Sequence, residues 1–502
     1  MNIAENVVAD EPGMQLPFQS ASDQLVALSK GDISSVELLD LYLKRVALHN
    51  KALNAIVTLD EERARAAAQA ADVARAKGMS LGPLHGLPIT VKDSFMTAGL
   101  RSTCGEPELT NYIPDIDAEA VSRLRAAGAI IFGKTNVPTS NLDVQTANPI
   151  FGATNNPFDL TRTPGGSAGG AAAAVSAGLT SVDFASEIGG STRVPAHFCG
   201  LYGHKTTFGA IPLTGHIGYG PKLPGRRAQP DMACGGVLAR SPDDIFPLIS
   251  AAAGPLDRDE GWRFAFAPPR ATDLRSFRIA AWFDDESCPV DAVVRGAMEG
   301  VIQLLEGIGA RVHRNPKQLP VQLEQSFRLF EQLLYGAVSN VKSTQTLPVV
   351  AATITRMLTK LGGEPARAVR GLFQSHKAWL GMDATRQLMR DNWAQFFQDF
   401  DVLLLPVTPT AAPPPHNKMN DRFGRYIEVD GERRSYWDQV KWNALANIAG
   451  SPATAFPVTF TSDGLPVGLQ VMGPSAGDLT TLQFARQITR LAGGYRVPPN
   501  FA

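Results

Sequence analysis

The sequence predicts an α/β fold, in which helices pack against a β-sheet. Two observations support this. Stretches with helical periodicity alternate along the chain with short, apolar, β-branched stretches, a pattern typical of sheets covered by helices. The chain has 502 residues, of which 44% are hydrophobic and 19% charged, enough to build a large core. We find no internal repeat, no low-complexity linker and no domain boundary.

Capping and breaker residues divide the chain into elements. Ser34 and Glu37 form a capping box at the start of the first long helix. Gly78 ends an alanine-rich helix, Asp117 caps the next helix, and Gly128 closes it. The helices are predicted at 34–49, 61–77, 117–127 and 168–178, and the strands at 89–91, 129–132, 180–185 and within 401–410.

The stretch 321–400 is helical and rich in aromatic residues. Phe327, Phe330 and Leu334 recur there at helical spacing. Such a stripe is more often core than binding site, but with Phe373 and Trp379 it also fits the wall of an apolar pocket.

Charge, cysteine content and hydropathy exclude several classes of protein. A net charge of -1 gives no basic patch for nucleic acid or an anionic membrane. The four cysteines form no C-x-x-C pair, so they predict reduced, buried thiols and neither a disulfide framework nor a zinc site. The acidic N-terminus resembles no signal peptide, and no stretch reaches about 18 apolar residues. We therefore expect a soluble, cytoplasmic protein without a membrane span.

Two other motifs carry little weight. The segment GAIIFGKT at 128–135 matches the phosphate-binding loop pattern, but its middle residues are themselves the predicted strand, and no helix follows. Lys134 is then a polar residue near a strand end. The eight histidines show no metal-ligand spacing, and each is expected to have an ordinary core or surface role.

Two glycine-flanked serines compete for the role of nucleophile. Ser167 lies in a literal G-x-S-x-G pattern, typical of a hydrolase nucleophile, and Ser191 follows two glycines in SEIGGSTR. A helix of about 11 residues and a strand of about 5 span similar lengths, so the chain returns from Ser167 to the same level at Ser191. If the strand that ends at Lys92 is parallel to the strand predicted at 180–185, then Lys92, Ser167 and Ser191 converge at the carboxyl edge of the sheet.

This trio can perform nucleophilic catalysis. A buried lysine has a lowered pKa and can act as a base. Asp93 need not neutralise Lys92, because successive strand side chains point to opposite faces. Unpaired N–H groups at the turn before the next helix would stabilise an oxyanion, which makes Ser191 the better nucleophile. The alternative is that the small residues at 165–170 and 189–191 merely allow tight packing.

The sequence resembles the amidase signature family. The resemblance rests on GGSAGG at 165–170, SEIGGSTR at 186–193, GPLHGLPITVKD around Lys92, GAIIFGKTN at 128–136 and NIAGSPATAFPVTFTSDGLPVGLQVMGP at 447–474. Several separate motifs in the same order cover most of the chain outside about 260–400.

The resemblance implies a structure and a set of roles. The expected fold is one domain over 1–502 with a single large mixed β-sheet covered by helices on both faces, and with a helical insert at about 321–400 that shapes the substrate pocket. Ser191 would be the nucleophile, Ser167 the relay serine after a cis peptide bond, and Lys92 the general base. The backbone of Ile188, Gly189, Gly190 and Ser191 would form the oxyanion hole. No metal or cofactor is implied.

The chain departs from the family pattern at several positions. Ala168 stands where a second serine is frequent, Ser186 where threonine is common, and Glu187 where aspartate is usual. GHKTT replaces the usual Gly-x-Lys-Pro-Thr. Glu187 adds a methylene beside the expected oxyanion turn, which puts the hydrogen bonds around that turn in question.

The implied activity is amide hydrolysis through a Ser191 acyl-enzyme. The first hypothesis is an amidase for small apolar or aryl amides, or related esters and carbamates, that acts without nucleic acid or membrane; a homodimer is left open as the commonest assembly. The alternative is the glutaminase-type subunit of a tRNA-dependent amidotransferase. A nucleotide-binding switch and a catalytically inactive scaffold are the hypotheses from other classes.

Overall fold

A computed structural model gives the fold. It describes residues 16–217, 230–256, 261, 263–316, 318–339, 363–416 and 424–502. Eleven strands in these ranges form one sheet, in the order β1-β3-β2-β6-β8-β7-β14-β15-β11-β9-β10. The strands are β1 Ile56–Leu59, β2 Pro88–Lys92, β3 Ile130–Thr135, β6 Asp183–Glu187, β7 Tyr202–Lys205, β8 Cys234–Ala239, β9 Ile279–Ala281, β10 Val312–Arg314, β11 Val402–Pro406, β14 Ala453–Phe460 and β15 Pro466–Met472.

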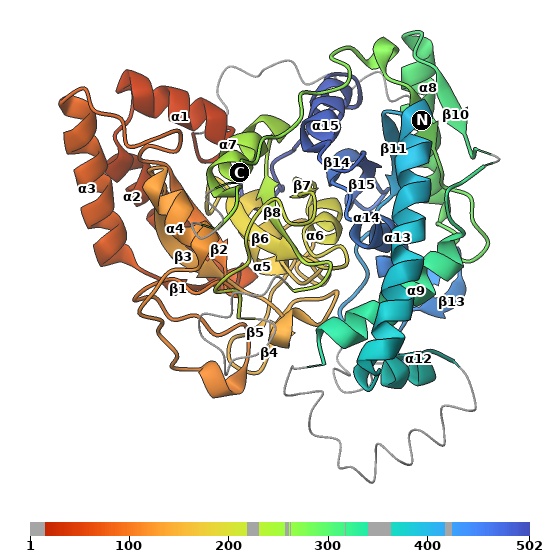
Figure 1. The fold of residues 1–502 in the computed structure, drawn as a ribbon. Coiled ribbons are helices and arrows are strands. Elements are labelled where there is room, and N and C mark those ends of the chain that lie inside the picture. Colours follow the sequence, from red (N-terminus) through yellow and green to blue (C-terminus); the bar gives the residue numbers. More distant parts are fainter. Residues whose placement is uncertain are drawn as a thin grey trace.

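Helices lie on both faces of this sheet (Figure 1). They are α1 Ala21–Lys30, α2 Ser35–Leu53, α3 Glu61–Ala76, α4 Glu119–Ala126, α5 Gly169–Ser176, α6 Arg193–Phe198, α7 Ile245–Ala252, α8 Ala292–Gly307, α9 Leu323–Ala337, α12 Gly363–Leu372, α13 His376–Asp399, α14 Asp438–Ala449 and α15 Asp478–Ala492. Two small pairs of strands lie outside the sheet: β4 Ala147–Asn148 with β5 Gly152–Ala153, and β12 Tyr426–Val429 with β13 Glu432–Ser435.

The sheet is mixed, which confirms the predicted α/β class with a large mixed sheet. Strands β2 and β3 are parallel, as are β2 and β6, whereas β8 runs antiparallel to both β6 and β7. The other half continues antiparallel through β7, β14, β15 and β11, then becomes parallel at β9 and β10. Parallel β2 and β6 therefore end at one edge of the sheet.

Helix α5 is buried on every side, between α2 and the sheet. Its sequence GGAAAAVS contains only small residues and one valine, which lets the backbone approach its neighbours closely. A Cβ added at Gly170 would lie 2.3 Å from Asn136 N, so that position accepts only glycine. This packing fixes the turn that precedes α5.

Most predicted elements are present, and the differences have physical reasons. The capping box of Ser34 and Glu37 begins α2 as predicted. Asp117 does not cap α4: its carboxylate accepts from Ala98 N, and Ala118 is the N-cap residue. Strand β6 begins at Asp183, three residues later than predicted, and it continues beyond the predicted end through Ser186 and Glu187, whose polar side chains are buried although they gave no strand signal.

Residues 128–135 do not form a phosphate-binding loop, because Ile130–Thr135 are strand β3 and the next element is a short 3-10 helix at Thr139–Asn141. Lys134 is buried near the end of that strand, and it donates to Thr97 Oγ1 at 2.9 Å and to Phe95 O. The structure thus supports the rejection of a nucleotide site at this motif.

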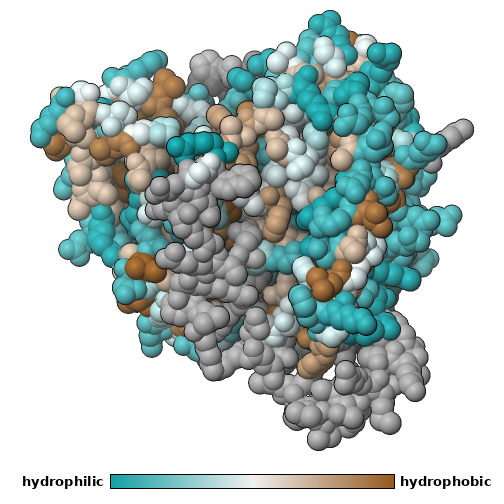
Figure 2. Space-filling view, viewed as in Figure 1, coloured by the Kyte–Doolittle hydropathy of each residue, from teal (hydrophilic) through white to brown (hydrophobic). Residues whose placement is uncertain are grey.

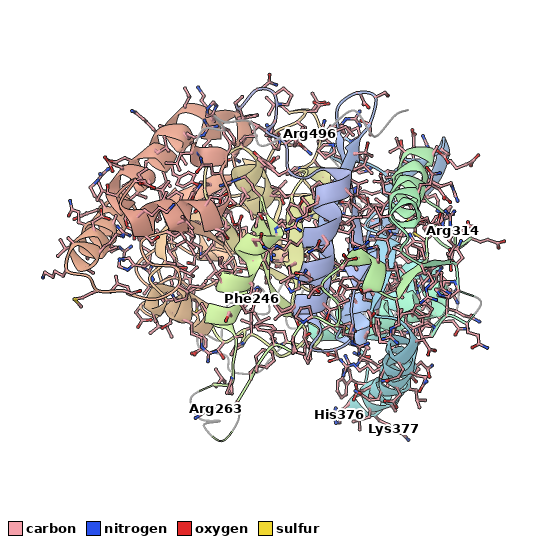
Figure 3. All side chains as sticks on the ribbon, turned by 90° about the horizontal axis from the view of Figure 1, so that it is seen from above. Phe246, Arg263, Arg314, His376, Lys377 and Arg496 are labelled. Atoms are coloured by element: carbon pink, nitrogen blue, oxygen red, sulfur yellow. The ribbon has the colours of Figure 1, made fainter. Side chains whose placement is uncertain are left out.

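Helices α9, α12 and α13 occupy the predicted helical stretch, of which residues 340–362 lie outside the described ranges. The three helices lie together at one end of the molecule (Figure 1), and His376 and Lys377 at the start of α13 lie at its periphery (Figure 3). Phe327 and Phe330 of α9 are buried, whereas Phe373 is exposed. The aromatic stripe is therefore partly core.

The surface in Figure 2 is mostly hydrophilic, with hydrophobic residues in small separate groups. The four cysteines are all buried and free. Within the described ranges, we find no helix that combines the length and the apolar character needed to cross a membrane.

Candidate active site

The site lies at the edge of the sheet where β2 and β6 end. The pairing of Thr90 with Asp183 and of Val91 with Phe184 sets Lys92 level with Ala185, so the two parallel strands end at the same edge of the sheet, with β6 two residues longer. Lys92 is the last residue of β2, and the turn that contains Ser191 follows β6 and leads into α6. The convergence that the sequence predicts therefore results from parallel pairing of two strands.

The three predicted groups form a continuous hydrogen-bonded chain. Lys92 Nζ lies 2.8 Å from Ser167 Oγ, and Ser167 Oγ lies 2.9 Å from Ser191 Oγ. Ala168 N also donates to Ser191 O at 3.1 Å, which ties the two turns together. The side chains of Lys92 and Ser167 are buried, and Ser191 is the most exposed of the three at 8%. Ser191 is thus the hydroxyl that a substrate reaches most easily.

Close backbone packing holds Ser167 in place. The peptide bond between Gly166 and Ser167 is cis, as the family resemblance implies. A Cβ at Gly166 would lie 2.6 Å from Asp143 O and 2.8 Å from Gln145 N, so the segment around Val144 leaves room only for glycine. The small residues before Ser167 are therefore required by packing.

Lys92 is a buried amine that forms no ion pair within the described part of the chain. Besides Ser167, Nζ donates to Ser186 O at 2.9 Å and lies 3.3 Å from Ser186 Oγ. Burial lowers the pKa of Lys92 to about 8, although the charges of Asp183 and Glu187 act in the opposite direction. The neutral amine that a general base requires is accessible near neutral pH.

The neighbouring Asp93 is engaged elsewhere, as the strand geometry predicts. Its Oδ2 accepts from Thr103 N at 3.0 Å and from Thr103 Oγ1 at 2.6 Å. Burial raises the pKa of Asp93, and the nearby cation that opposes this rise is Lys134. Asp93 therefore leaves the charge of Lys92 uncompensated.

The carboxylate of Glu187 organises the turn that carries Ser191. It accepts from Gly190 N at 3.0 Å and from Thr192 N at 3.0 Å, and it pairs with the guanidinium of Arg193. Burial alone would raise the pKa of Glu187, but Arg193 and Thr192 hold it at about 2. Although glutamate is one methylene longer than the aspartate usual at this position, its carboxylate still accepts hydrogen bonds from the turn, at Gly190 N and Thr192 N.

This contact changes the expected oxyanion hole. The N–H of Gly190 already donates to Glu187. The candidate donors toward a substrate oxyanion are then the N–H groups of Ile188, Gly189 and Ser191. Gly190 shapes the turn instead: its φ is +102°, and a Cβ there would lie 2.9 Å from Asn443 Cγ.

Side chains from distant segments face the turn. A Cβ at Gly189 would lie 3.0 Å from Phe330 Cζ of α9 and 3.2 Å from Val440 Cγ1 of α14. The side chains beside Gly189 are therefore apolar, whereas the polar side chain of Asn443 lies beside Gly190. Phe330 belongs to the aromatic stretch predicted to fit a pocket wall, whereas Val440 lies in no motif and was not predicted at the site.

Two polar side chains near Lys92, those of Ser186 and His216, were not predicted at the site. Ser186 was noted only as a departure from the family pattern, and His216 only as one of eight histidines. In the structure Ser186 Oγ lies 2.8 Å from His216 Nε2. Nothing in the spacing of these residues, 30 positions apart, signals the contact. Among the described residues, no group of three or more His, Cys, Asp or Glu side chains is arranged to hold a metal ion.

Comparisons with known proteins agree on one family. A protein-family model described as amidase matches residues 37–482. The A subunit of the glutamyl-tRNA(Gln) amidotransferase from Roseiflexus sp. (strain RS-1) is 32% identical over 95% of this chain and 97% of its own. The protein of the same name from Synechococcus sp. (strain CC9605) is 31% identical, over 95% and 96%. A crystal structure described as amidase superimposes with a TM-score of 0.75 and 27% identity, over 95% of this chain and all of that one.

These relatives overturn one expectation, that of a small-molecule amide as the only partner with no nucleic acid involved. The relatives are named as subunits of an enzyme that acts on glutamyl-tRNA(Gln). The expectation was wrong because the net charge of one chain bears only on direct binding of nucleic acid by that chain, and it cannot exclude an enzyme of several subunits that acts on a tRNA.

The first prediction concerns the nucleophile. Ser191→Ala should abolish covalent labelling by a serine-directed fluorophosphonate, because it removes the hydroxyl at the accessible end of the chain. Ser167→Ala should leave slow labelling. Intact-mass spectrometry measures both, and Ser29→Ala on the exposed face of α1 serves as the control. Labelling that persists in Ser191→Ala and maps to Ser167 would contradict the assignment.

The second prediction concerns the pH dependence of labelling. The rate should rise with pH through about 8, as Lys92 loses its proton. Asp183→Asn should move this rise to lower pH, since a nearby negative charge stabilises the ammonium form. The amide can keep the bonds from Thr90 and Thr135.

Asp244→Asn is the matched control for this prediction. Burial raises the pKa of Asp244 to about 6, but its carboxylate accepts from Ser22 N at 2.8 Å, outside the site. Its pH profile should match that of the unaltered protein. An unchanged profile for Asp183→Asn would show that another group controls the rise.

The third prediction concerns stability. Glu187→Gln should lower the free energy of unfolding at pH 7 by about 3–5 kcal/mol, because Arg193 is left buried without its counter-charge. The pKa of Glu187 is lowered in the folded state, so its contribution is present above about 4.5 and is lost as pH falls through about 2. The difference between the two proteins, measured by urea denaturation, should shrink over that range. Glu299→Gln, in the exposed pair with Arg314, should cost less than about 1 kcal/mol.

Proposed function

Since the chain belongs to the amidase signature family of amidohydrolases, we propose that it is the amide-hydrolysing subunit of a tRNA-dependent amidotransferase. The observation that carries this proposal is similarity along nearly the whole length of both chains to amidotransferase A subunits. An amidotransferase moves an amide nitrogen from donor to acceptor. Hydrolysis of the donor amide, with glutamine as the donor, is the step that we assign to this chain.

The hydrogen-bonded chain supplies the path of the proton. Ser191 Oγ attacks the amide carbonyl and gives its proton to Ser167 Oγ, which passes its own proton to neutral Lys92. The separations of 2.8 and 2.9 Å between these atoms are hydrogen-bond lengths, so no group has to move far. The buried position of Lys92 favours the neutral amine that this transfer requires.

The turn between β6 and α6 supports the charge that develops on the carbonyl oxygen. The N–H groups of Ile188, Gly189 and Ser191 are the proposed donors, and a lost donor of this kind typically slows a reaction about 10²–10³-fold. Ammonia leaves with the proton returned by Ser167, and an acyl ester on Ser191 remains. Water then attacks the ester, with the same serine and lysine as the base.

A second candidate function concerns the acyl group. Phe330 and Val440 face Gly189, and Phe330 is fully buried. A free amino acid needs partners for its charged amino and carboxylate groups, whereas Phe330 and Val440 offer only apolar contact; the polar side chain of Asn443 lies beside Gly190 instead. The wall of Phe330 and Val440 therefore favours an amide with an apolar acyl group, and hydrolysis of such amides is the second candidate.

The fourth prediction separates the two candidates. The tagged chain is purified from its native cells with whatever subunits accompany it, and ammonia release is measured from L-glutamine and from butyramide. We expect partner subunits to co-purify and glutamine to be the better substrate by at least about tenfold in kcat/KM, or about 1.4 kcal/mol. The Ser191→Ala protein, purified in the same way, is the control for contaminating glutaminases.

The opposite pattern contradicts the first candidate. If the chain purifies alone and hydrolyses butyramide faster than glutamine, the apolar wall determines the substrate. If neither amide is hydrolysed while Ser191 still reacts with a fluorophosphonate, the site is active and both substrate proposals fail.

A further inference from the structure

The hydrogen-bonded chain does not end at Lys92. Ser186 Oγ lies 3.3 Å from Lys92 Nζ on one side and 2.8 Å from His216 Nε2 on the other. Ser186 and His216 are both buried. Five side chains are thus linked in a line, in the order Ser191, Ser167, Lys92, Ser186 and His216.

The valences of Lys92 restrict how this line can be arranged. A neutral amine has two N–H donors and one lone pair. The carbonyl oxygen of Ser186, 2.9 Å from Nζ, can only accept, so it takes one N–H. If the other N–H points to Ser186 Oγ, the lone pair is left for Ser167 Oγ at 2.8 Å. That is the arrangement in which Lys92 can receive a proton from Ser167.

The hydroxyl of Ser186 determines whether this arrangement holds. When its proton points to Lys92, it competes with Ser167 for the lone pair, and the base is misdirected. When its proton points to another acceptor, Ser186 Oγ is free to accept from Lys92. His216 Nε2, at 2.8 Å, is placed to be that acceptor. It can accept only if the ring is neutral and carries its proton on Nδ1.

We propose that His216 is a positioning residue, which accepts the Ser186 hydroxyl proton and thereby turns the lone pair of Lys92 toward Ser167. This inference rests on the proposed role of Lys92 as the base. Every donor then points the same way, from Ser191 through Ser167, Lys92 and Ser186 to His216. The ring does not itself receive the proton of Ser191, because Ser186 and Lys92 lie between them.

The surroundings of His216 suit this role. Burial, together with the charges of Lys92 and Lys134, keeps the pKa of His216 well below its usual value of 6.5, so the ring is neutral. The ring meets Phe95 edge-on with centroids 4.9 Å apart. Backbone contacts hold the segment: Phe95 and His216 form a β-bridge, and Ile217 N donates to Ser94 O at 2.7 Å. Phe95 follows Lys92 by three residues, so the ring and the amine are fixed by one turn.

The fifth prediction tests the acceptor. His216→Phe keeps an aromatic ring but removes Nε2, and His216→Gln can place an amide oxygen near the same position. The rate constant for fluorophosphonate labelling should fall about 10–100-fold in His216→Phe, a part of the 10²–10⁴-fold that a general base typically contributes. The loss should persist above pH 9, where Lys92 is neutral in both proteins. His216→Gln should recover most of the rate.

A double-mutant comparison distinguishes positioning from a general loss of structure. If His216 acts through the hydroxyl of Ser186, then adding His216→Phe to the Ser186→Ala protein should not lower its labelling rate constant any further. Misfolded molecules are not labelled, so they lower the final extent of labelling but leave the rate constant of the folded molecules unchanged. The rate constant therefore reports on positioning, and the final extent reports on folding. The inference would be overturned if the fold-losses in rate of the two single variants multiplied in the double variant. It would also be overturned if the His216→Phe protein were labelled as fast as the unaltered one. Lys92→Met distinguishes failure of the His216 proposal from failure of the proposed base. If the Lys92→Met protein is labelled as fast as the unaltered one, Lys92 is not the base.

Discussion

The burial of one amine without a carboxylate beside it is the constraint on which the site depends. Lys92 stands at the end of a buried strand, and each acid near it is engaged elsewhere. Asp93 accepts from Thr103, Glu187 is paired with Arg193, and Asp183 accepts from Thr90 and Thr135. A direct ion pair would fix the ammonium form, and the base would be lost. The polar groups that surround Lys92 instead are hydroxyls and a carbonyl, which tolerate a neutral amine.

The small residues at 165–170 both allow close packing and include one of the hydroxyls of the site. The sequence left open whether the small residues at 165–170 serve packing or catalysis. The structure shows that Gly166 and Gly170 leave no room for a side chain, and that Ser167, which follows Gly166 directly, lies 2.9 Å from Ser191. The two alternatives are therefore not exclusive.

Local sequence signals predicted the framework well and the interior contacts poorly. Caps, breakers and apolar runs indicated α2, α3, β2 and β11, and the family resemblance and the mixed-sheet fold are confirmed. The trio of Lys92, Ser167 and Ser191 was found because each member lies in a glycine-rich motif or at a strand end; their roles remain proposals. His216 and Val440 were missed, because they reach the site from segments without a motif: an isolated bridge to Phe95 brings His216 there, and Val440 comes from α14, which packs against α9. Gly190 was assigned to the oxyanion hole because spacing does not reveal that Glu187 already binds its N–H.

Residues within motifs carry the proposed chemistry, whereas residues from distant helices lie where the acyl group would bind. The type of reaction is therefore easier to infer from the sequence than the substrate. The groups proposed as attacking hydroxyl, relay and base come from 92–191, a continuous part of the chain with strong local constraints. The wall beside the oxyanion turn comes from Phe330 and Val440, which belong to helices packed against each other. Such positions can change side chain without disturbing the proton path, because they contact Gly189 only through van der Waals surface. One reaction can thus be kept while the acyl group that the site accepts varies.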